Sequence, residues 1–335
     1  MKVLTFFYLW YGTPQYDGYY SHWNHTVLPH WTESVNKQYA QIGTSHKPED
    51  DDLHSPYYPA EGPYSSSDPA KLKAQMLEMA SAGVDIAVTS WWGRPSVSSA
   101  DSQGTQTDPI FPAMLHAAMD TNVKIAFLLE PYHNRNSTNI MTDISYINEQ
   151  YGQHPSVYKI DDKIVFYVYD HYHIPYTEWK TIVMPEINPK GYYYGLVLNP
   201  SDVTNLIDSN FNGGFTYFSS DQMSWGSNSR NWHAVCDKLL AGGLDCDISI
   251  GSGYDDTKIR PWNSMNTVSR SAEHFKRQID WALAAKPTSI SITSFNEWGE
   301  GTQWESCENR VGYSECLNLE AEMIAGIKIN NRNEL

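Results

Sequence analysis

Two glutamates lie close together near the carboxyl end of the chain, in the segment Asn296-Glu297-Trp298-Gly299-Glu300. Paired carboxyl groups are the apparatus of glycoside hydrolysis, in which one protonates the departing oxygen and the other stabilises or forms the bond at the anomeric carbon. An acid needs a raised pKa, which a partly desolvated position beside a second carboxylate and Trp298 can supply. On spacing alone, a solvated loop with two incidental glutamates explains the segment equally well.

Other catalytic chemistries have weaker support. The sequence has no HExxH motif, and His22 and His25 with the acidic run 49–52 and His54 make only a weak metal site. The Gly-Ser-Gly segment 251–253 lacks the nucleophile-elbow pattern, and no phosphate-binding glycine loop is present. We therefore predict a site without a catalytic metal, a serine nucleophile or a nucleotide.

The composition narrows the class of ligand. The formal net charge of −16 argues against nucleic acid or an anionic membrane surface, because both bind clustered Lys and Arg. The chain carries 12 Trp and 23 Tyr, and ordinary packing accounts for about half of these rings. A ring with one polar edge suits a sugar, since it stacks on C–H faces while hydroxyl groups hydrogen-bond alongside. A neutral or cationic ligand, and a sugar in particular, is therefore expected.

Eight apolar runs of strand length alternate with helical patterns along the chain. The runs are rich in Ile, Val, Phe and Tyr without strict alternation, as expected for parallel strands that helices cover. This repetition predicts an α/β chain with one catalytic (β/α)8 barrel domain over residues 1–335. The expected strands are residues 3–9, 84–89, 124–129, 164–169, 194–198, 214–218, 245–250 and 289–294. The expected helices are residues 70–82, 109–120, 141–152, 176–183, 202–209, 230–241, 269–285 and 317–327.

Two connections are longer than a barrel needs. Residues 10–66 hold many aromatic and histidine side chains, and residues 93–108 are rich in Ser, Gly, Asp and Gln. Both follow a predicted strand, so we expect them at the C-terminal face, where barrel active sites are built. The ends of the predicted strands and the residues that follow them bring carboxylates, aromatic rings and one arginine to the same face. They are Tyr11, Trp91, Trp92, Glu130, Asp170, Tyr217, Tyr254, Arg260, Glu297 and Glu300.

Four cysteines are too few for a disulfide scaffold. Cys236 falls in a helical pattern and Cys246 in an apolar strand, so both are predicted to be buried thiols. Cys307 and Cys316 flank a short loop and can pair in an oxidising compartment, an alternative that the sequence leaves open. No run of about 20 apolar residues predicts a membrane span, and a first strand from Val3 leaves no room for a signal peptide, so any targeting segment would have to precede these residues.

Short motifs along nearly the whole chain resemble the endo-α-1,2-mannosidase and endo-α-1,2-mannanase family, glycoside hydrolase family 99. Their joint occurrence in this order is far more specific than any single motif. They are Phe7-Tyr8-Leu9-Trp10-Tyr11-Gly12, His22-Trp23-Asn24-His25, Tyr64-Ser65-Ser66, Glu130-Pro131-Tyr132, His154-Pro155, Tyr167-Val168-Tyr169-Asp170, Thr216-Tyr217-Phe218, Ile259-Arg260-Pro261-Trp262-Asn263 and Thr293-Ser294-Phe295-Asn296-Glu297-Trp298.

The resemblance implies retaining, endo-acting cleavage of an α-1,2-mannosidic bond without a metal or organic cofactor. Glu297 would be the base on the 2-hydroxyl of the reacting sugar, so that O2 displaces the leaving group through a 1,2-anhydro sugar. Glu300 would be the acid and later the base that activates water. This scheme differs from the common attack of a carboxylate on the anomeric carbon.

The resemblance also suggests residues that bind substrate. Tyr11 and Tyr217 resemble residues near the reacting sugar, His25 belongs to a shared motif, and Asn296 would orient the catalytic loop. Trp92 would form the stacking wall for the next sugar on the non-reducing side, whereas Trp91 fits core packing equally well. Candidates for the sugar hydroxyls, or for holding the groups that bind them, are Glu130, Tyr254 and Arg260, and an ion pair between Glu130 and an arginine is an equal alternative.

Departures from the family pattern leave the natural substrate open. Gly299 stands where many members carry histidine, which puts one local hydrogen bond in doubt, and the tail after Glu305 is shorter. Trp92 resembles the bacterial mannan-cutting members, while the opening segment and residues 93–108 resemble the animal form that trims glucosylated N-glycans.

The predicted partner is therefore an α-mannoside glycan, with no nucleic acid and no obligate protein partner. A catalytically inactive carbohydrate-binding barrel is the alternative from another class, and a retaining hydrolase of different linkage specificity is a weaker third. The resemblance suggests the Golgi lumen for a eukaryotic chain, and the periplasm or extracellular space for a bacterial one. Any membrane contact would need a segment outside these residues.

Overall fold

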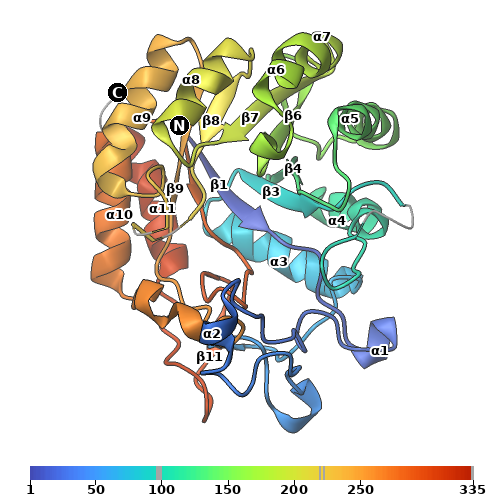
Figure 1. Cartoon of the computed structure of the whole chain (residues 1–335), viewed down its shortest axis with the longest axis vertical. Helices are drawn as coiled ribbons and strands as arrows, with labels where there is room; N and C mark the ends of the chain where they lie inside the picture. Colours follow the sequence, from blue (N-terminus) through green and yellow to red (C-terminus); the bar gives the residue numbers. More distant parts are fainter. Residues whose placement is uncertain (96–99, 219, 222, 333–335) are drawn as a thin grey trace.

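Eight parallel strands close into a barrel in the computed structural model, which describes residues 1–95, 100–218, 220–221 and 223–332. Neighbouring strands pair in the order β4-β3-β1-β10-β9-β8-β7-β6, and the pairing of β4 with β6 completes the ring. This confirms the predicted (β/α)8 fold (Figure 1). The strands are β1 (Lys2–Phe7), β3 (Ile86–Trp91), β4 (Lys124–Leu129), β6 (Lys163–Val168), β7 (Gly191–Leu196), β8 (Gly213–Phe215), β9 (Asp245–Ile250) and β10 (Ser289–Ile292).

The strands are buried on both faces, which explains their nearly continuous apolar sequence. Successive side chains of a strand point to opposite sides. In β1, Leu4 and Phe6 belong to the cluster inside the barrel, whereas Val3 and Phe7 belong to the core between the strands and the helices. The short strand β5 (Lys159–Ile160) pairs antiparallel with β6 and lies outside the ring.

Helices surround the strands (Figure 1), and their ends follow the local sequence. Asp68 caps α3 (Pro69–Ser81) by accepting a hydrogen bond from the Ala70 amide, and Pro69 occupies the first helical position. The predicted helix at 176–183 is longer than expected, because α6 (Tyr176–Glu178) runs through a wide turn at Trp179–Val183 into α7 (Met184–Ile187). The other large helices are α4 (Phe111–Ala118), α5 (Ser137–Tyr151), α8 (Pro200–Asp208), α9 (Trp232–Ala241), α10 (Ala272–Ala284) and α11 (Glu320–Arg332).

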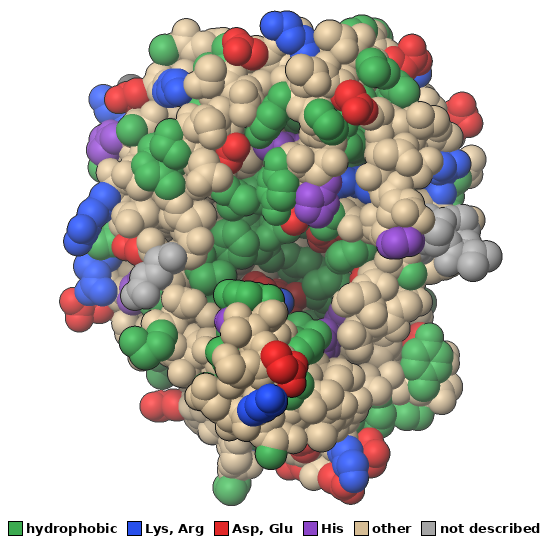
Figure 2. Space-filling view, in the orientation of Figure 1, with side chains coloured by type: hydrophobic (Ala, Val, Ile, Leu, Met, Phe, Trp, Pro, Cys, Tyr) green, Lys and Arg blue, Asp and Glu red, His purple; other side chains and the backbone are tan. Residues whose placement is uncertain are grey.

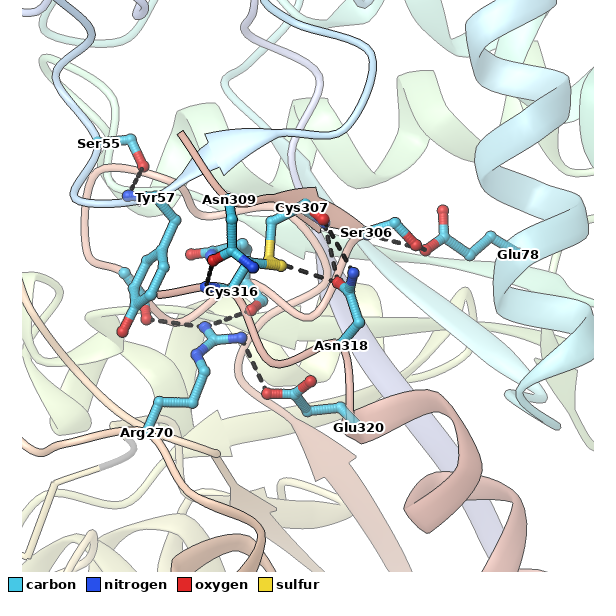
Figure 3. Close-up of a disulfide and its surroundings, with 12 residues drawn as sticks. Ser55, Tyr57, Glu78, Arg270, Ser306, Cys307, Asn309, Cys316, Asn318 and Glu320 are labelled. Atoms are coloured by element: carbon cyan, nitrogen blue, oxygen red, sulfur yellow. Dashed lines mark hydrogen bonds and ion pairs between the residues drawn. A yellow bond between two sulfur atoms is a disulfide. The ribbon is translucent and has the colours of Figure 1, made fainter. Parts of the chain in front are cut away.

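The long segment after β1 carries only short elements, α1 (Pro14–Asp17), α2 (Glu33–Asn36) and β2 (Tyr58–Pro59). Strand β2 pairs antiparallel with β11 (Cys307–Glu308), which joins this segment to the loop that follows β10. Cys307 and Cys316 form a disulfide in that loop (Figure 3). Arg270 lies over the ring of Tyr57, pairs with Glu320 at 2.9 Å and donates to the carbonyls of Gly301 and Gln303, so it connects the loop after β10 to this segment and to the start of α11.

One cysteine prediction is wrong. Cys236 and Cys246 are buried as expected, but they form a disulfide instead of two thiols. Helix α9 packs on strand β9 and brings the two Cα atoms to 5.2 Å, within the range that a disulfide spans.

None of the helices that the structure describes is long and apolar enough to cross a membrane.

Candidate active site

A cavity of about 190 Å³ opens among the loops that follow the strands. Figure 2 shows a hollow near the centre of the view, where hydrophobic, acidic and histidine side chains gather. Both long connections and the loop after β10 contribute to the cavity wall, as expected for the C-terminal face of a barrel. The lining residues are Trp10, His22, His25, Leu28, His54, Trp92, Asp101, Ser102, Ile259, Arg260, Glu297 and Glu300.

Glu297 is fixed by hydrogen bonds of its neighbours to the first strand and its continuation. The side chain of Asn296 accepts from the Tyr8 amide at 2.8 Å and donates to the Tyr8 carbonyl at 2.9 Å. The Tyr11 hydroxyl donates to the Asn296 carbonyl at 2.8 Å and accepts from the Trp298 amide at 3.1 Å. Asn296 and Tyr11 are both buried, so in this structure they position the loop and do not line the cavity.

The buried carboxylate of Glu305 stabilises the loop that carries Glu297 and Glu300. Glu305 accepts hydrogen bonds from Tyr64 at 2.6 Å and from the Trp298 indole at 3.0 Å on one oxygen. Its other oxygen accepts from Gln75 at 2.8 Å and pairs with the Lys71 ammonium group at 3.1 Å. Both oxygens are therefore satisfied, which fixes Trp298 between the two cavity glutamates.

Glu300 has far fewer partners. Its Oε1 atom lies 3.4 Å from Arg260, and its buried Oε2 atom has no hydrogen-bond partner in the part of the chain that the structure describes. Arg260 is held by Asp256 at 3.0 Å, and Asp256 also accepts from Tyr254 and Asn263. Tyr254 thus acts on the cavity through Asp256, while Arg260 reaches the cavity itself.

Burial and nearby charges shift the pKa values of the two cavity glutamates. Burial raises the pKa of Glu297 well above its usual value, and the nearby Glu300 carboxylate adds to the rise. Burial also raises the pKa of Glu300, against the opposing effect of Arg260. Two carboxyl groups so placed retain a proton at a pH where free glutamic acids have lost theirs. The site can therefore present an acid and a base together.

Three histidines line the cavity, and the sequence had placed two of them only in a weak metal site. His22 stacks on Trp10 at 4.3 Å between ring centroids and lies 2.6 Å from Asp101 of the second long connection. Burial lowers the pKa of His25 to about 4 and that of His54 well below its usual value, so both imidazoles are neutral at pH 7. Among the described residues, no group of three His, Cys, Asp or Glu side chains is arranged to hold a metal ion.

The neighbouring tryptophans Trp91 and Trp92 differ. Trp91 packs in the core outside the barrel, near Tyr146, and its indole donates to Asp108 at 2.7 Å. It faces away from the cavity, so the expectation that Trp91 contacts a ligand is corrected in favour of the packing alternative. Trp92 lines the cavity, and its buried indole nitrogen has no partner within the described residues.

Two other predicted residues lie off the cavity lining. The hydroxyl of Tyr217 is hydrogen-bonded to that of Tyr8 inside the barrel. Glu130 accepts from Ser90 at 2.8 Å, and burial raises its pKa to about 8. Arg135 instead donates to the backbone carbonyls of Leu129 and Asp170, so in the described structure the alternative of an ion pair between Glu130 and an arginine is not formed.

The cavity therefore brings together five of the predicted site residues: His25, Trp92, Arg260, Glu297 and Glu300. Trp10, His22, His54 and Asp101 line it as well and were not predicted as ligand contacts. Their common signal was their place in the two long connections at the C-terminal face. A (β/α)8 barrel with two glutamates of raised pKa in an aromatic cavity has the features of a glycoside hydrolase.

Comparison with known proteins identifies the family. The model of glycosyl hydrolase family 99 matches residues 1–319, and the chain belongs to this family, as the motifs indicated. The chain is 38% identical to glycoprotein endo-alpha-1,2-mannosidase from Mus musculus over 314 residues, which cover 90% of this chain and 67% of that protein. It is 36% identical to the glycoprotein endo-alpha-1,2-mannosidase-like protein from Homo sapiens, with the same two shares covered.

The fold comparison agrees. The GH99 endo-alpha-mannosidase from Bacteroides thetaiotaomicron superposes with a TM-score of 0.88 at 28% identity, over 99% of this chain and 97% of that one. The chain is thus a glycoside hydrolase of family 99.

Proposed function

We propose that this chain is a retaining endo-α-1,2-mannosidase that cuts internal α-1,2-mannosidic bonds of high-mannose glycans or mannan. One observation carries the proposal: Glu297 and Glu300 both line one cavity, and burial raises the pKa of each carboxyl group. The names of the relatives from Mus musculus and Bacteroides thetaiotaomicron support the linkage and the endo mode.

The proposed first step uses the two glutamates in opposite protonation states. Ionised Glu297 takes the proton of the 2-hydroxyl, and its raised pKa makes it a stronger base than a free glutamate. O2 then forms a bond to C1 while the C1–O bond to the leaving group breaks, which gives a 1,2-anhydro sugar. Protonated Glu300 gives its proton to the departing oxygen, so charge does not accumulate there.

The second step reverses these roles. Glu300, now ionised, takes a proton from water as the water oxygen attacks C1 and the C1–O2 bond breaks. Glu297 returns its proton to O2. Two displacements at C1 leave the product with the configuration of the substrate, and both glutamates return to their starting states.

We further propose that Trp92 forms the wall for the sugar next to the reacting one and that Arg260 holds Glu300 in place. Two disulfides favour an oxidising compartment, which suits the Golgi lumen or an exported bacterial enzyme. We also infer that residues 1–335 act as one catalytic domain.

Product analysis tests this function. The purified chain and a Glu300→Gln variant are incubated with a glucosylated high-mannose glycan and, separately, with an α-1,2-linked manno-oligosaccharide. Cleavage of either substrate by the native chain alone would support the proposal, and the preferred substrate would decide between N-glycan and mannan. Binding of both without cleavage would instead support the inactive carbohydrate-binding barrel.

A further inference from the structure

Gly299, between the two cavity glutamates, has a neighbour that restricts it to glycine. A Cβ atom at this position would lie 2.8 Å from Cδ2 and 3.0 Å from Nε2 of His54, and 3.2 Å from Oε1 of Glu297. The backbone of Gly299 is not among the glycines with positive φ, so its conformation suits other residues too. Glycine is required here by the space that the His54 ring occupies.

His54 has little freedom to move aside. The residue is 2% exposed, and its ring lies 5.8 Å from that of Trp23, 6.2 Å from that of Tyr11 and 6.2 Å from that of His25, measured between centroids. A ring packed against three others cannot yield to a methyl group without displacing them. The imidazole and a side chain at position 299 therefore exclude each other.

The hydrogen bonds of His54 indicate which ring nitrogen carries the proton. Nδ1 is buried and has no partner among the residues that the structure describes. A neutral imidazole has one donor and one acceptor, and a buried unpaired acceptor is commoner than a buried unpaired donor. The proton therefore belongs on Nε2, on the ring edge that faces Gly299 and Glu297 along the cavity wall.

We propose that His54 is a substrate-binding residue whose Nε2–H donates to a hydroxyl group of the sugar held against Glu297, in a position that Gly299 leaves open. The proposal rests on the proposed function, because it concerns the same sugar. It adds a contact that reaches the site from the segment after β1, far from the glutamates in sequence. The lowered pKa of His54 agrees with a neutral donor at this place.

Two amide variants test the position of the donor. The side-chain nitrogen of His54→Gln reaches the place of Nε2, whereas that of His54→Asn reaches the place of Nδ1. We expect His54→Gln to keep kcat/KM within about threefold of native and His54→Asn to lose about tenfold, mainly through KM, as for one lost hydrogen bond. Equal activity of the two variants would overturn the proposal, because a space-filling role does not distinguish them.

A second pair of variants tests the exclusion between the two positions. Gly299→Ala is expected to lower kcat/KM about tenfold by displacing the imidazole. In a His54→Ala background, the same substitution is expected to cause a much smaller further loss, because only the 3.2 Å approach to Oε1 of Glu297 remains. Gly326→Ala in α11 is the matched control, since a Cβ atom there meets nothing within 4 Å. Full activity of Gly299→Ala would contradict the proposal.

Calorimetric binding separates this proposal from the proposed function. In a Glu300→Gln background, an α-1,2-linked mannotriose is expected to bind about tenfold more weakly when His54→Asn is added, and nearly unchanged when His54→Gln is added. Cleavage by the native chain with no effect of His54 variants on binding would overturn this proposal alone. Absence of both cleavage and binding in the native chain would overturn both.

Discussion

Two glutamates of the same loop, Glu305 and Glu300, have opposite surroundings. Glu305 has partners on both oxygens, including an ammonium group and an indole N–H, whereas Glu300 has one long contact and one buried oxygen without a partner among the described residues. A carboxylate that only holds the fold satisfies its oxygens within the protein, because an unpaired buried oxygen costs stability. An unsatisfied one is available to a ligand.

Trp91 and Trp92 repeat this contrast at the end of β3. The indole of Trp91 is paired with Asp108 outside the barrel, and the indole of Trp92 is unpaired at the cavity wall within the described residues. In both pairs, the residue that lines the cavity carries a buried polar atom that has no partner among the described residues. The comparison therefore distinguishes structural from functional positions, and four predictions test it.

The largest expected effect is on catalysis. Glu297→Gln and Glu300→Gln are each expected to lower kcat/KM by about a thousandfold, the range of acid–base catalysis. Neither variant should lower the melting temperature at pH 7, because an amide is less costly to bury than a carboxylate with few partners. Initial rates and thermal melts on the same samples provide the test. A melting temperature well below native would assign these glutamates to the structural class.

Glu305→Gln should have the opposite profile. The substitution leaves Lys71 without its buried partner, so we expect the free energy of unfolding to fall by about 3 kcal/mol in urea titrations. Glu308→Gln is the control, since Glu308 is half exposed and pairs with Arg310 at 3.6 Å. The control should change stability by less than about 1 kcal/mol. Similar losses of unfolding free energy in Glu305→Gln and Glu308→Gln would contradict a structural role for Glu305.

Substitution of the two tryptophans should have smaller effects, on stability for Trp91 and on KM for Trp92. Trp91→Phe removes the hydrogen bond to Asp108 and should cost about 1 to 2 kcal/mol of stability with little change in KM. Trp92→Phe breaks no hydrogen bond in the described protein, so it should preserve stability and raise KM by about threefold through weaker stacking. Urea unfolding and steady-state kinetics on both variants would show whether the two effects separate. A raised KM in Trp91→Phe together with a loss of stability in Trp92→Phe would refute the assignment of Trp91 to the core and Trp92 to the cavity.

The last prediction concerns the pH dependence of stability that Glu130 causes. Its pKa of about 8 in the folded chain is higher than in the unfolded chain, so the folded state holds an extra proton between about pH 4.3 and 8. Stability from this group is complete below that window and falls as pH rises through it, by at most about 1.4 kcal/mol per pH unit. Glu130→Gln lacks this dependence, so its stability relative to native should grow from pH 5 to 8. A constant difference across this range would contradict the assignment.

The sequence was sufficient for the barrel because strands buried on both faces leave nearly continuous apolar runs. The predicted bounds of β4 and β9 agree with the structure, since polar turns flank both runs. The disulfide between Cys236 and Cys246 was missed, because it depends on how α9 docks on β9 and not on the local sequence. The direction of the Trp91 side chain could have been predicted, because successive side chains of a strand point to opposite sides and Trp92 was expected at the cavity.

The glutamate pair was found from its spacing and its motif, but most of the cavity wall was not. His54 comes from the middle of a long connection without regular structure, and no local pattern places its ring beside Gly299. Tyr11 was expected near the sugar and Asn296 at the loop after β10; the structure bonds Tyr11 to that loop and bonds Asn296, within the loop, to Tyr8. Such contacts depend on loop conformation, which hydrophobic periodicity does not encode.

The most direct measurement is the anomeric configuration of the first product, followed by proton NMR during cleavage of an α-1,2-linked manno-oligosaccharide. We expect the native chain to release the α-anomer first and Glu300→Gln to release no product on the same timescale. Release of the β-anomer first, or cleavage by Glu300→Gln at the native rate, would contradict a retaining mechanism that depends on this pair.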